Sequence, residues 1–202
     1  DLAFKYRNPA IILADGVIGQ MMEKVVLPEQ RTRLTDEEVI ARCPWATTGR
    51  THHRTPNIIT SLELDPAEME KRNIHLQKKY AEIEENEVRF EELHCEDAEY
   101  LIVAFGSCAR IAQKAMEMAR EEGIKVGLLR PITLWPFPSK AIAARAAQVK
   151  GILTVELNAG QMVEDVRLAV ECKVPVEHFG RLGGIVPDPD EVITALKEKL
   201  IK

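Results

Sequence analysis

The sequence has no uninterrupted apolar run that approaches the roughly eighteen residues of a membrane span. It also lacks a surplus of positive charge, because 27 lysines and arginines stand against 32 aspartates and glutamates, for a formal net charge of −5. Sequence-independent binding of nucleic acid requires a basic surface. We therefore expect a protein that neither crosses a membrane nor binds nucleic acid. No signal peptide is recognisable, and the chain begins with Asp1 rather than Met, so we expect part of a longer protein.

The complete motifs of familiar catalytic sites are missing too. The chain contains no GxSxG, GxGxxG, GxxxxGK[ST] or HExxH sequence. Its four cysteines lie far apart and form no CxxC pair, which is typical of reduced thiols in a cytoplasmic protein rather than of a disulfide framework. We accordingly assign no catalytic, cofactor-binding or metal-binding residue from motifs.

What the sequence does contain is a repeated strand–helix pattern, clearest at Tyr100–Ser107. The five apolar or aromatic residues Leu101–Phe105 directly precede Gly106, which is the pattern of a buried strand. The apolar residues that follow are spaced as in a helix that lies on a sheet. The repeat predicts an α/β domain with a parallel sheet. The expected strands are Leu101–Phe105, Val126–Leu129, Ile152–Glu156 and Val174–His178, and the expected helices are Cys108–Glu122, Ser139–Gln148, Gln161–Glu171 and Pro189–Leu200.

Residues 65–86 have the pattern of a long helix. Asp65 is a suitable N-cap and is followed by Pro66 at the first helical position. The apolar seam is narrow and the remaining surface is charged, which favours a linking helix, with a short coiled coil as the alternative. The seam consists of Met69, Leu76, Tyr80 and Ile83.

The sequence pattern of residues 1–64 does not predict a complete domain with a core of its own. Within 1–30 we expect the last turns of a helix at Asp1–Arg7, a strand at Pro9–Ala14 and a helix at Val17–Val26 capped by Asp15. A single strand cannot satisfy its own edges, so this part requires a partner or lies loosely on the rest. Residues 31–64 are expected to be an irregular linker.

One candidate site is a crevice at the carboxyl edge of the sheet. If the strand order reverses between the strands ending at Phe105 and Glu156, two helix-opening turns meet there, and their free N–H groups favour an anion or an acidic partner. The alternative is that both turns only cap helices, with Ser107 as an N-cap and Cys108 as a packing residue rather than a nucleophile. The candidate residues are Gly106, Ser107, Cys108, Asn158, Gly160 and Gln161.

A second candidate is an anion-holding loop, in which arginine would grip a carboxylate or phosphate. A solvated loop is the favoured alternative. Its residues are Thr47, Thr48, Gly49 and Arg50.

Beyond these patterns, the chain resembles the C-terminal part of the α subunit of 2-oxoacid:ferredoxin oxidoreductases, most closely the 2-ketoisovalerate (branched-chain) type. The matching runs touch nearly the whole length. They are NPAIILADGVIGQMMEKVVLP, WATTGR, NIITSLELDPAEMEK, LIVAFGSCARIA, LRPITLWPFP, VELNAGQMVEDVRLAV and VEHFGRLGGIVPDPDEV.

The resemblance implies a three-layer sandwich with a mostly parallel five-stranded sheet, of the transketolase C-terminal type, whose first strand is antiparallel and lies near Glu87–Leu93. It divides the chain into the end of a thiamine-diphosphate pyrimidine-binding domain (1–30), a linker (31–64), a linking helix (65–86) and the transketolase C-terminal-like domain (87–202). The carboxylate that activates the cofactor would lie outside this chain. Glu84, Glu85 and Glu87 are poor substitutes, since their charged surroundings imply no apolar pocket.

The activity implied for the whole enzyme is oxidative decarboxylation of a 2-oxoacid to an acyl-CoA with reduction of ferredoxin. That enzyme would use thiamine diphosphate, Mg²⁺, iron–sulfur clusters and CoA, and would contain a β subunit and iron–sulfur subunits. This chain would bind no cofactor, would be inactive alone, and would act as a scaffold and interface domain. The alternative from another class is a stand-alone α/β module that binds a small anionic ligand.

Overall fold

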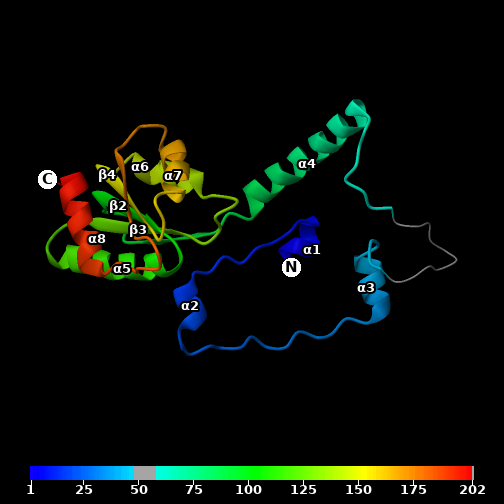
Figure 1. Ribbon diagram of the computed structural model, residues 1–202, viewed down its shortest axis with the longest axis horizontal. Helices are drawn as coiled ribbons and strands as arrows, with labels where there is room; N and C mark the ends of the chain where they lie inside the picture. The colour runs from blue at the N-terminus through cyan, green and yellow to red at the C-terminus, as the bar shows by residue number, and fades with distance from the viewer. Residues whose placement is uncertain (48–57, 202) are drawn as a thin grey trace. The chain divides into compact units, whose positions relative to one another are not determined.

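The computed structural model describes residues 1–47 and 58–201 (Figure 1). The chain divides into two units by its internal contacts. The larger unit comprises Asp1–Met21 and Gln77–Lys202, and the smaller one comprises Met22–Leu76. Every strand of the described chain lies in the larger unit.

A five-stranded sheet forms the centre of the larger unit, in the order β1-β3-β2-β4-β5. β1 is antiparallel to β3, whereas all other neighbouring strands are parallel. The mostly parallel sheet and its antiparallel first strand are therefore confirmed. The strand expected at Val174–His178 begins two residues later. The strands are β1 (Phe90–Leu93), β2 (Tyr100–Ala104), β3 (Val126–Pro131), β4 (Gly151–Glu156) and β5 (Val176–Gly180).

Helices cover both faces of this sheet (Figure 1). One core joins Ile102 and Leu153 to α5 (Gly106–Glu121) and α8 (Pro189–Leu196), and the other joins Leu101 and Ile152 to α6 (Ser139–Ala146) and α7 (Met162–Val170). Successive residues of β2 and β4 thus enter opposite cores, which is why these strands are apolar without alternation. The three-layer α/β architecture is confirmed.

Helix α8 begins at the capping box expected for it. Asp188 accepts from the N–H of Glu191, while the Glu191 side chain accepts from the N–H of Asp188. The helix continues as a wider turn over Lys197–Ile201, where the Leu200 side chain packs against Gly151 at the start of β4.

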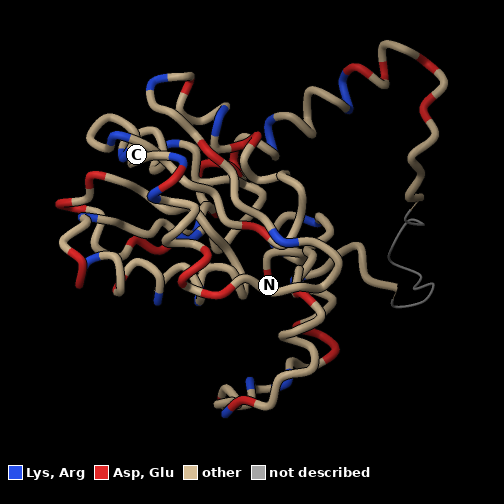
Figure 2. The backbone as a smooth tube through the Cα atoms, turned by 60° about the vertical axis from the view of Figure 1, so that its left-hand side comes forward, with Lys and Arg blue, Asp and Glu red and all other residues tan. Residues whose placement is uncertain are grey.

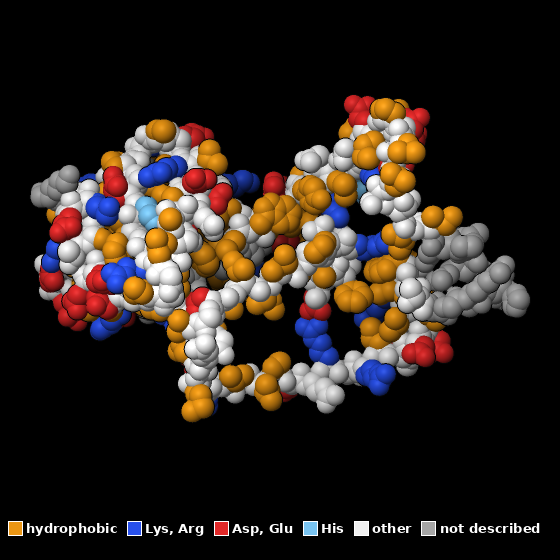
Figure 3. Space-filling model, viewed as in Figure 1, with side chains coloured by type: hydrophobic (Ala, Val, Ile, Leu, Met, Phe, Trp, Pro, Cys, Tyr) orange, Lys and Arg blue, Asp and Glu red, His pale blue; other side chains and the backbone are white. Residues whose placement is uncertain are grey.

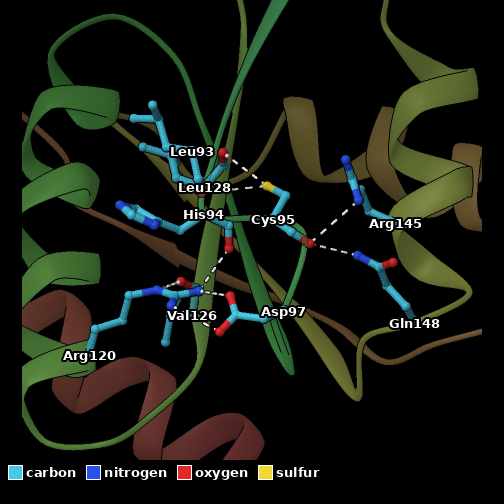
Figure 4. Close-up of polar contacts among 9 residues, drawn as sticks. All are labelled: Leu93, His94, Cys95, Asp97, Arg120, Val126, Leu128, Arg145 and Gln148. Atoms are coloured by element: carbon cyan, nitrogen blue, oxygen red, sulfur yellow. Dashed lines mark hydrogen bonds and ion pairs between the residues drawn. The ribbon is translucent and has the colours of Figure 1, made fainter.

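The turn between β1 and β2 is held from both faces of the sheet (Figure 4). Arg120 of α5 donates to the carbonyl of His94 at 2.8 Å and to Asp97 at 2.7 Å. From the opposite face, the Gln148 side chain donates to the carbonyl of Cys95 at 2.7 Å. Both helical layers are therefore tied to one turn.

The N-terminal residues of the larger unit form less structure than expected. Helices α1 (Leu2–Tyr6) and α2 (Gly16–Gln20) are present, but residues 9–14 pair with no strand of the described chain. Asp15 caps α2 as expected, whereas the helix stops well short of Val26. A strand at Pro9–Ala14 was thus a wrong expectation for this chain, because an extended segment needs a neighbouring strand to hold its N–H and C=O groups.

Glu87 ties this N-terminal part to the domain. The Tyr6 hydroxyl and the Lys5 ammonium each donate to Glu87 Oε1 at 2.7 Å, and these two bonds hold the pKa of the Glu87 carboxyl below its usual value. Glu87 is buried. The residues that bury it come from a distant part of the sequence, so the charged run around Glu87 did not indicate this burial.

The smaller unit contains α3 (Asp36–Arg42) and the first half of α4 (Pro66–Asn86). Helix α3 was missed, although a capping box of Thr35 and Glu38 marks its start, because one short helix has no sustained period. Helix α4 is confirmed, with Asp65 accepting from the N–H of Ala67 at 2.8 Å. All four seam residues of α4 are buried or half-buried.

Replacing Gly127 of β3 by alanine tests how closely the turn between β1 and β2 packs on β3. Its Cβ would lie 3.0 Å from both the Ala98 Cβ and the His94 carbonyl oxygen. Backbone cannot yield as a flexible side chain can, so Gly127→Ala is expected to lower the free energy of unfolding by about 1–3 kcal/mol in urea titrations. The matched control is Gly19→Ala in α2, where a Cβ meets nothing within 4 Å. Equal stability of the two variants would contradict the prediction.

Candidate functional site

The order of the strands reverses between the neighbouring strands β2 and β4. The carboxyl ends of these two strands lie next to each other at one edge of the sheet. Ala104 at the end of β2 pairs with Val155, one residue before the end of β4. From there the chain enters α5 on one face and α7 on the other. Ligands and functional loops of open α/β sheets gather at such a point.

The structure brings the two expected turns to this edge. Gly106 begins α5 with φ at +57°, a conformation that glycine adopts without strain. Ser107 and Cys108 follow within the first helical turn and are buried. On the other side, the Asn158 side chain accepts from the N–H of Gly160 at 2.7 Å, and Gln161 is the N-cap position of α7. The N-cap of α5 is Phe105, so the expected capping role of Ser107 is wrong.

The N–H groups that open α7 are not free for an external anion. Glu156, which is 1% exposed, accepts from the N–H of Met162 at 2.8 Å and of Val163 at 3.1 Å, with that of Gln161 at 3.3 Å. A carboxylate on the neighbouring strand thus caps this helix from within the protein and satisfies the positive end of its dipole.

His178 of β5 completes the polar group around Glu156. Its Nδ1 lies 3.5 Å from Glu156 Oε1 and 3.3 Å from the hydroxyl of Thr154, while Nε2 lies 3.3 Å from the carbonyl of Asn158. The ring also faces Gly180, where a Cβ would come within 2.2 Å of the Asn158 carbonyl oxygen. His178 is therefore a half-buried, hydrogen-bonded histidine in the middle of β5.

The opening of α5 receives a carboxylate from the N-terminal residues. Hydrogen bonding from the Ser107 hydroxyl is the main cause that lowers the pKa of Asp15, and the N–H groups of Ile18, Val17 and Ser107 act in the same direction. The sequence indicated Asp15 only as the cap of its own helix. Only the spatial proximity of α2 and α5 reveals its second contact.

The thiol of Cys108 is unsuited to nucleophilic chemistry. Burial raises its pKa to about 11, and the carboxylates of Asp15 and Glu156 act in the same direction. Burial likewise raises the pKa of Cys95 to about 11. The packing role expected for Cys108 agrees with its burial in the core beneath α5.

The other candidate, the anion-holding loop, falls mostly outside the described residues. Thr47 is described and exposed, whereas Thr48, Gly49 and Arg50 are not among the described residues. Among the described residues, no group of three or more histidine, cysteine, aspartate or glutamate side chains could hold a metal ion. Charges of both signs are interspersed over the larger unit (Figure 2). None of the helices described in the chain has the length and apolar character needed to cross a bilayer.

Thiol alkylation tests the assignment of the cysteines. At pH 8 we expect iodoacetamide to modify the exposed Cys172 and to leave Cys95 and Cys108 unmodified, since the latter two are buried and their thiols stay protonated. Peptide mass spectrometry before and after addition of urea provides the measurement. Labelling of native Cys108 as fast as that of Cys172 would contradict the assignment.

Replacement of Glu156 tests its capping of α7. In Glu156→Gln an amide NH₂ takes the place of one carboxylate oxygen and faces backbone N–H groups, so we expect the free energy of unfolding to fall by about 1–3 kcal/mol. Glu164→Gln is the matched control, because Glu164 is an exposed residue in the first turn of the same helix and should change stability by no more than about 0.5 kcal/mol. Urea titration of both variants gives the comparison.

Several known proteins are similar to this chain in sequence or in fold. Residues 98–192 match the family model described as "Pyruvate:ferredoxin oxidoreductase core domain II". The chain is 44% identical over 198 residues to ketoisovalerate oxidoreductase subunit VorB of Methanothermobacter marburgensis, covering 98% of this chain and 54% of that protein. It is 31% identical over 190 residues to 2-oxoglutarate synthase subunit KorA of Archaeoglobus fulgidus, covering 93% of this chain and 52% of that protein.

A solved structure agrees with these relatives. It is the 2-oxoglutarate:ferredoxin oxidoreductase from Magnetococcus marinus, with 2-oxoglutarate, coenzyme A and succinyl-CoA bound, and it matches with a TM-score of 0.60 and 26% identity. The match covers 67% of this chain and 24% of that one. The chain spans about half the length of the curated relatives it matches. Over nearly its whole length the chain is thus similar to part of the subunits of 2-oxoacid:ferredoxin oxidoreductases.

Proposed function

We propose that the chain is the scaffold and interface part of the α subunit of a thiamine-diphosphate-dependent oxidoreductase that acts on 2-ketoisovalerate-like acids. The observation that carries this proposal is the 44% identity over 98% of the chain with a ketoisovalerate oxidoreductase subunit. Identity to the 2-oxoglutarate synthase subunits is lower, at 26–31%. The whole enzyme would oxidatively decarboxylate its substrate to an acyl-CoA and pass the electrons to ferredoxin.

The proposed domain organisation follows the sequence divisions. Residues 1–30 would be the end of a pyrimidine-binding domain, 31–64 a linker, 65–86 a linking helix and 87–202 the transketolase C-terminal-like domain. The exposure of the first part supports this division, because Ile11, Ile12 and Leu13 are 70–97% exposed in an extended segment that has no partner strand among the described residues. Hydrophobic side chains lie on the surface of the chain in Figure 3. Burial of such a row requires a further piece of protein.

Cofactor chemistry is proposed to belong to other parts of the enzyme. The buried carboxylates of the described residues, Glu87 and Glu156, are both hydrogen-bonded to donors of this chain, so neither is available to activate a cofactor. Thiamine diphosphate with Mg²⁺, the iron–sulfur clusters and CoA would be bound with the rest of the subunit, a β subunit and iron–sulfur subunits. We place the complex in the cytoplasm.

The alternative of a stand-alone module for a small anion has less support. It depends on free N–H groups at the carboxyl edge, whereas those of α7 are bonded to Glu156 and Ser107 of α5 interacts with Asp15.

A chimera tests the proposed function. This chain would replace the matching half of VorB from Methanothermobacter marburgensis, and the complex would be purified with its native partner subunits. We expect assembly and 2-ketoisovalerate-dependent reduction of ferredoxin, with lower activity toward 2-oxoglutarate. The isolated chain should be inactive and should give no heat on calorimetric titration with thiamine diphosphate.

The control is the same chimera with Gly180→Ala, which should disrupt the carboxyl edge because the added Cβ would lie 2.2 Å from the Asn158 carbonyl oxygen. If the chimera without Gly180→Ala assembles but does not reduce ferredoxin with 2-ketoisovalerate, the proposed activity is refuted. A chimera that folds but recruits no partner subunit would refute the interface role.

A further inference from the structure

We propose that His178 is a proton-dependent clamp, which ties the turn at residues 157–161 to β4 and β5 while its ring carries two protons. His178 follows Val176 by two residues, so both lie on the face of the sheet that α7 covers. The turn opens α7 and follows β4, one of the two strands between which the strand order reverses. The clamp therefore acts at the carboxyl edge of the sheet.

Both nitrogen atoms of the His178 ring face oxygen atoms. Nδ1 lies 3.3 Å from Thr154 Oγ1 and 3.5 Å from Glu156 Oε1, and Nε2 lies 3.3 Å from the carbonyl oxygen of Asn158. The Thr154 hydroxyl donates its proton to the carbonyl of Glu177 at 3.2 Å, so it presents its lone pairs to the ring. A carboxylate and a carbonyl can only accept, so both sides of the ring are satisfied together only when both nitrogens carry a proton.

Two glycines leave the space that the ring fills. A Cβ at Gly160 would lie 3.6 Å from His178 Cδ2, and a Cβ at Gly180 would lie 2.7 Å from Nε2. Gly160 also has a φ of +111°, which residues with a side chain rarely adopt. The ring thus occupies a slot between the turn and β5. The side chain of His178 is 21% exposed, so the ring can exchange protons with water.

The charge next to the ring is that of Glu156, whose buried carboxylate lies within ion-pair distance of Nδ1. Arg167 of α7 donates to the carbonyl of Val176, and Arg181 donates to Glu191, so both guanidinium groups are engaged elsewhere. The other charged side chains on the elements around the ring are Glu164 and Asp165 of α7 and Glu177 of β5. A cation in the ring is therefore matched by the carboxylate beside it.

Loss of one proton opens one side of the clamp. The Nδ1 proton is retained, because a nitrogen lone pair facing the Glu156 carboxylate would be repelled by it. The proton that leaves is that of Nε2, and the Asn158 carbonyl then faces a lone pair instead of a donor. Glu156 stays bonded to the N–H groups of Met162 and Val163. Rising pH thus releases the turn and leaves the start of α7 in place, and this property of the 202-residue chain does not depend on the partners proposed above.

Amide hydrogen exchange of the full chain across a pH series tests the clamp. After correction for the intrinsic pH dependence of exchange, we expect the protection of Gly160 and Gln161 to fall about tenfold between about pH 5 and 8, where histidines change charge. His178→Gln cannot titrate and should show no such decline. The matched control is His75→Gln, because His75 is exposed on α4, and it should behave as the wild type. A decline that persists in His178→Gln, or is absent from the wild type, would overturn the clamp.

The protons on the ring can be observed in the wild type, which keeps the test valid if His178→Gln does not fold. In a chain labelled with ¹⁵N-histidine, contacts of the ring with the protons of Gly160 and Gly180 identify the His178 signals. We expect both nitrogens to be protonated at pH 5 and Nδ1 alone at pH 8. A proton on Nε2 alone at pH 8, or the same protonation at both pH values, would contradict the proposal.

Discussion

The two central strands, β2 and β4, are covered by helices on both faces, so the polar groups at their carboxyl ends must find partners inside the protein. This constraint explains the chemistry of the carboxyl edge. Glu156 ends a fully buried strand and satisfies the opening N–H groups of α7, and Asp15 interacts with the opening of α5. Arginine and glutamine side chains perform the equivalent task for carbonyl groups at the opposite end of the sheet (Figure 4).

The sheet domain and the N-terminal segment differ in how completely they bury their apolar side chains. The sheet domain closes its own core and leaves the described buried side-chain polar atoms hydrogen-bonded. The N-terminal segment instead exposes Ile11, Ile12 and Leu13, and it is tied to the domain by the hydrogen bonds of Lys5 and Tyr6 to Glu87. A self-sufficient core beside an uncovered apolar segment is consistent with part of a subunit whose relatives are about twice as long.

Strands and helices of the domain could be predicted because each has a local signal. The apolar run at Leu101–Phe105, the stripe after Cys108 and the Asp188–Glu191 capping box depend on neighbours in sequence, and the structure reproduces them to within a few residues. The strand expected at Pro9–Ala14 failed for the opposite reason, since a strand is defined by the chain beside it. Helix α3 was missed because one short helix has too few apolar repeats to reveal a period.

By itself, the sequence determined the α/β class, the alternation of elements and the position of both helix-opening turns, because periodicity and glycine placement are local properties. The tertiary structure alone decided what those turns bind. Glu156 reads in sequence as the last residue of a strand and Asp15 as the cap of a short helix, yet folding places each carboxylate at the N-terminal end of a helix. Which N–H groups stay free depends on distances between residues far apart in the chain, and those distances exist only after the sheet has formed.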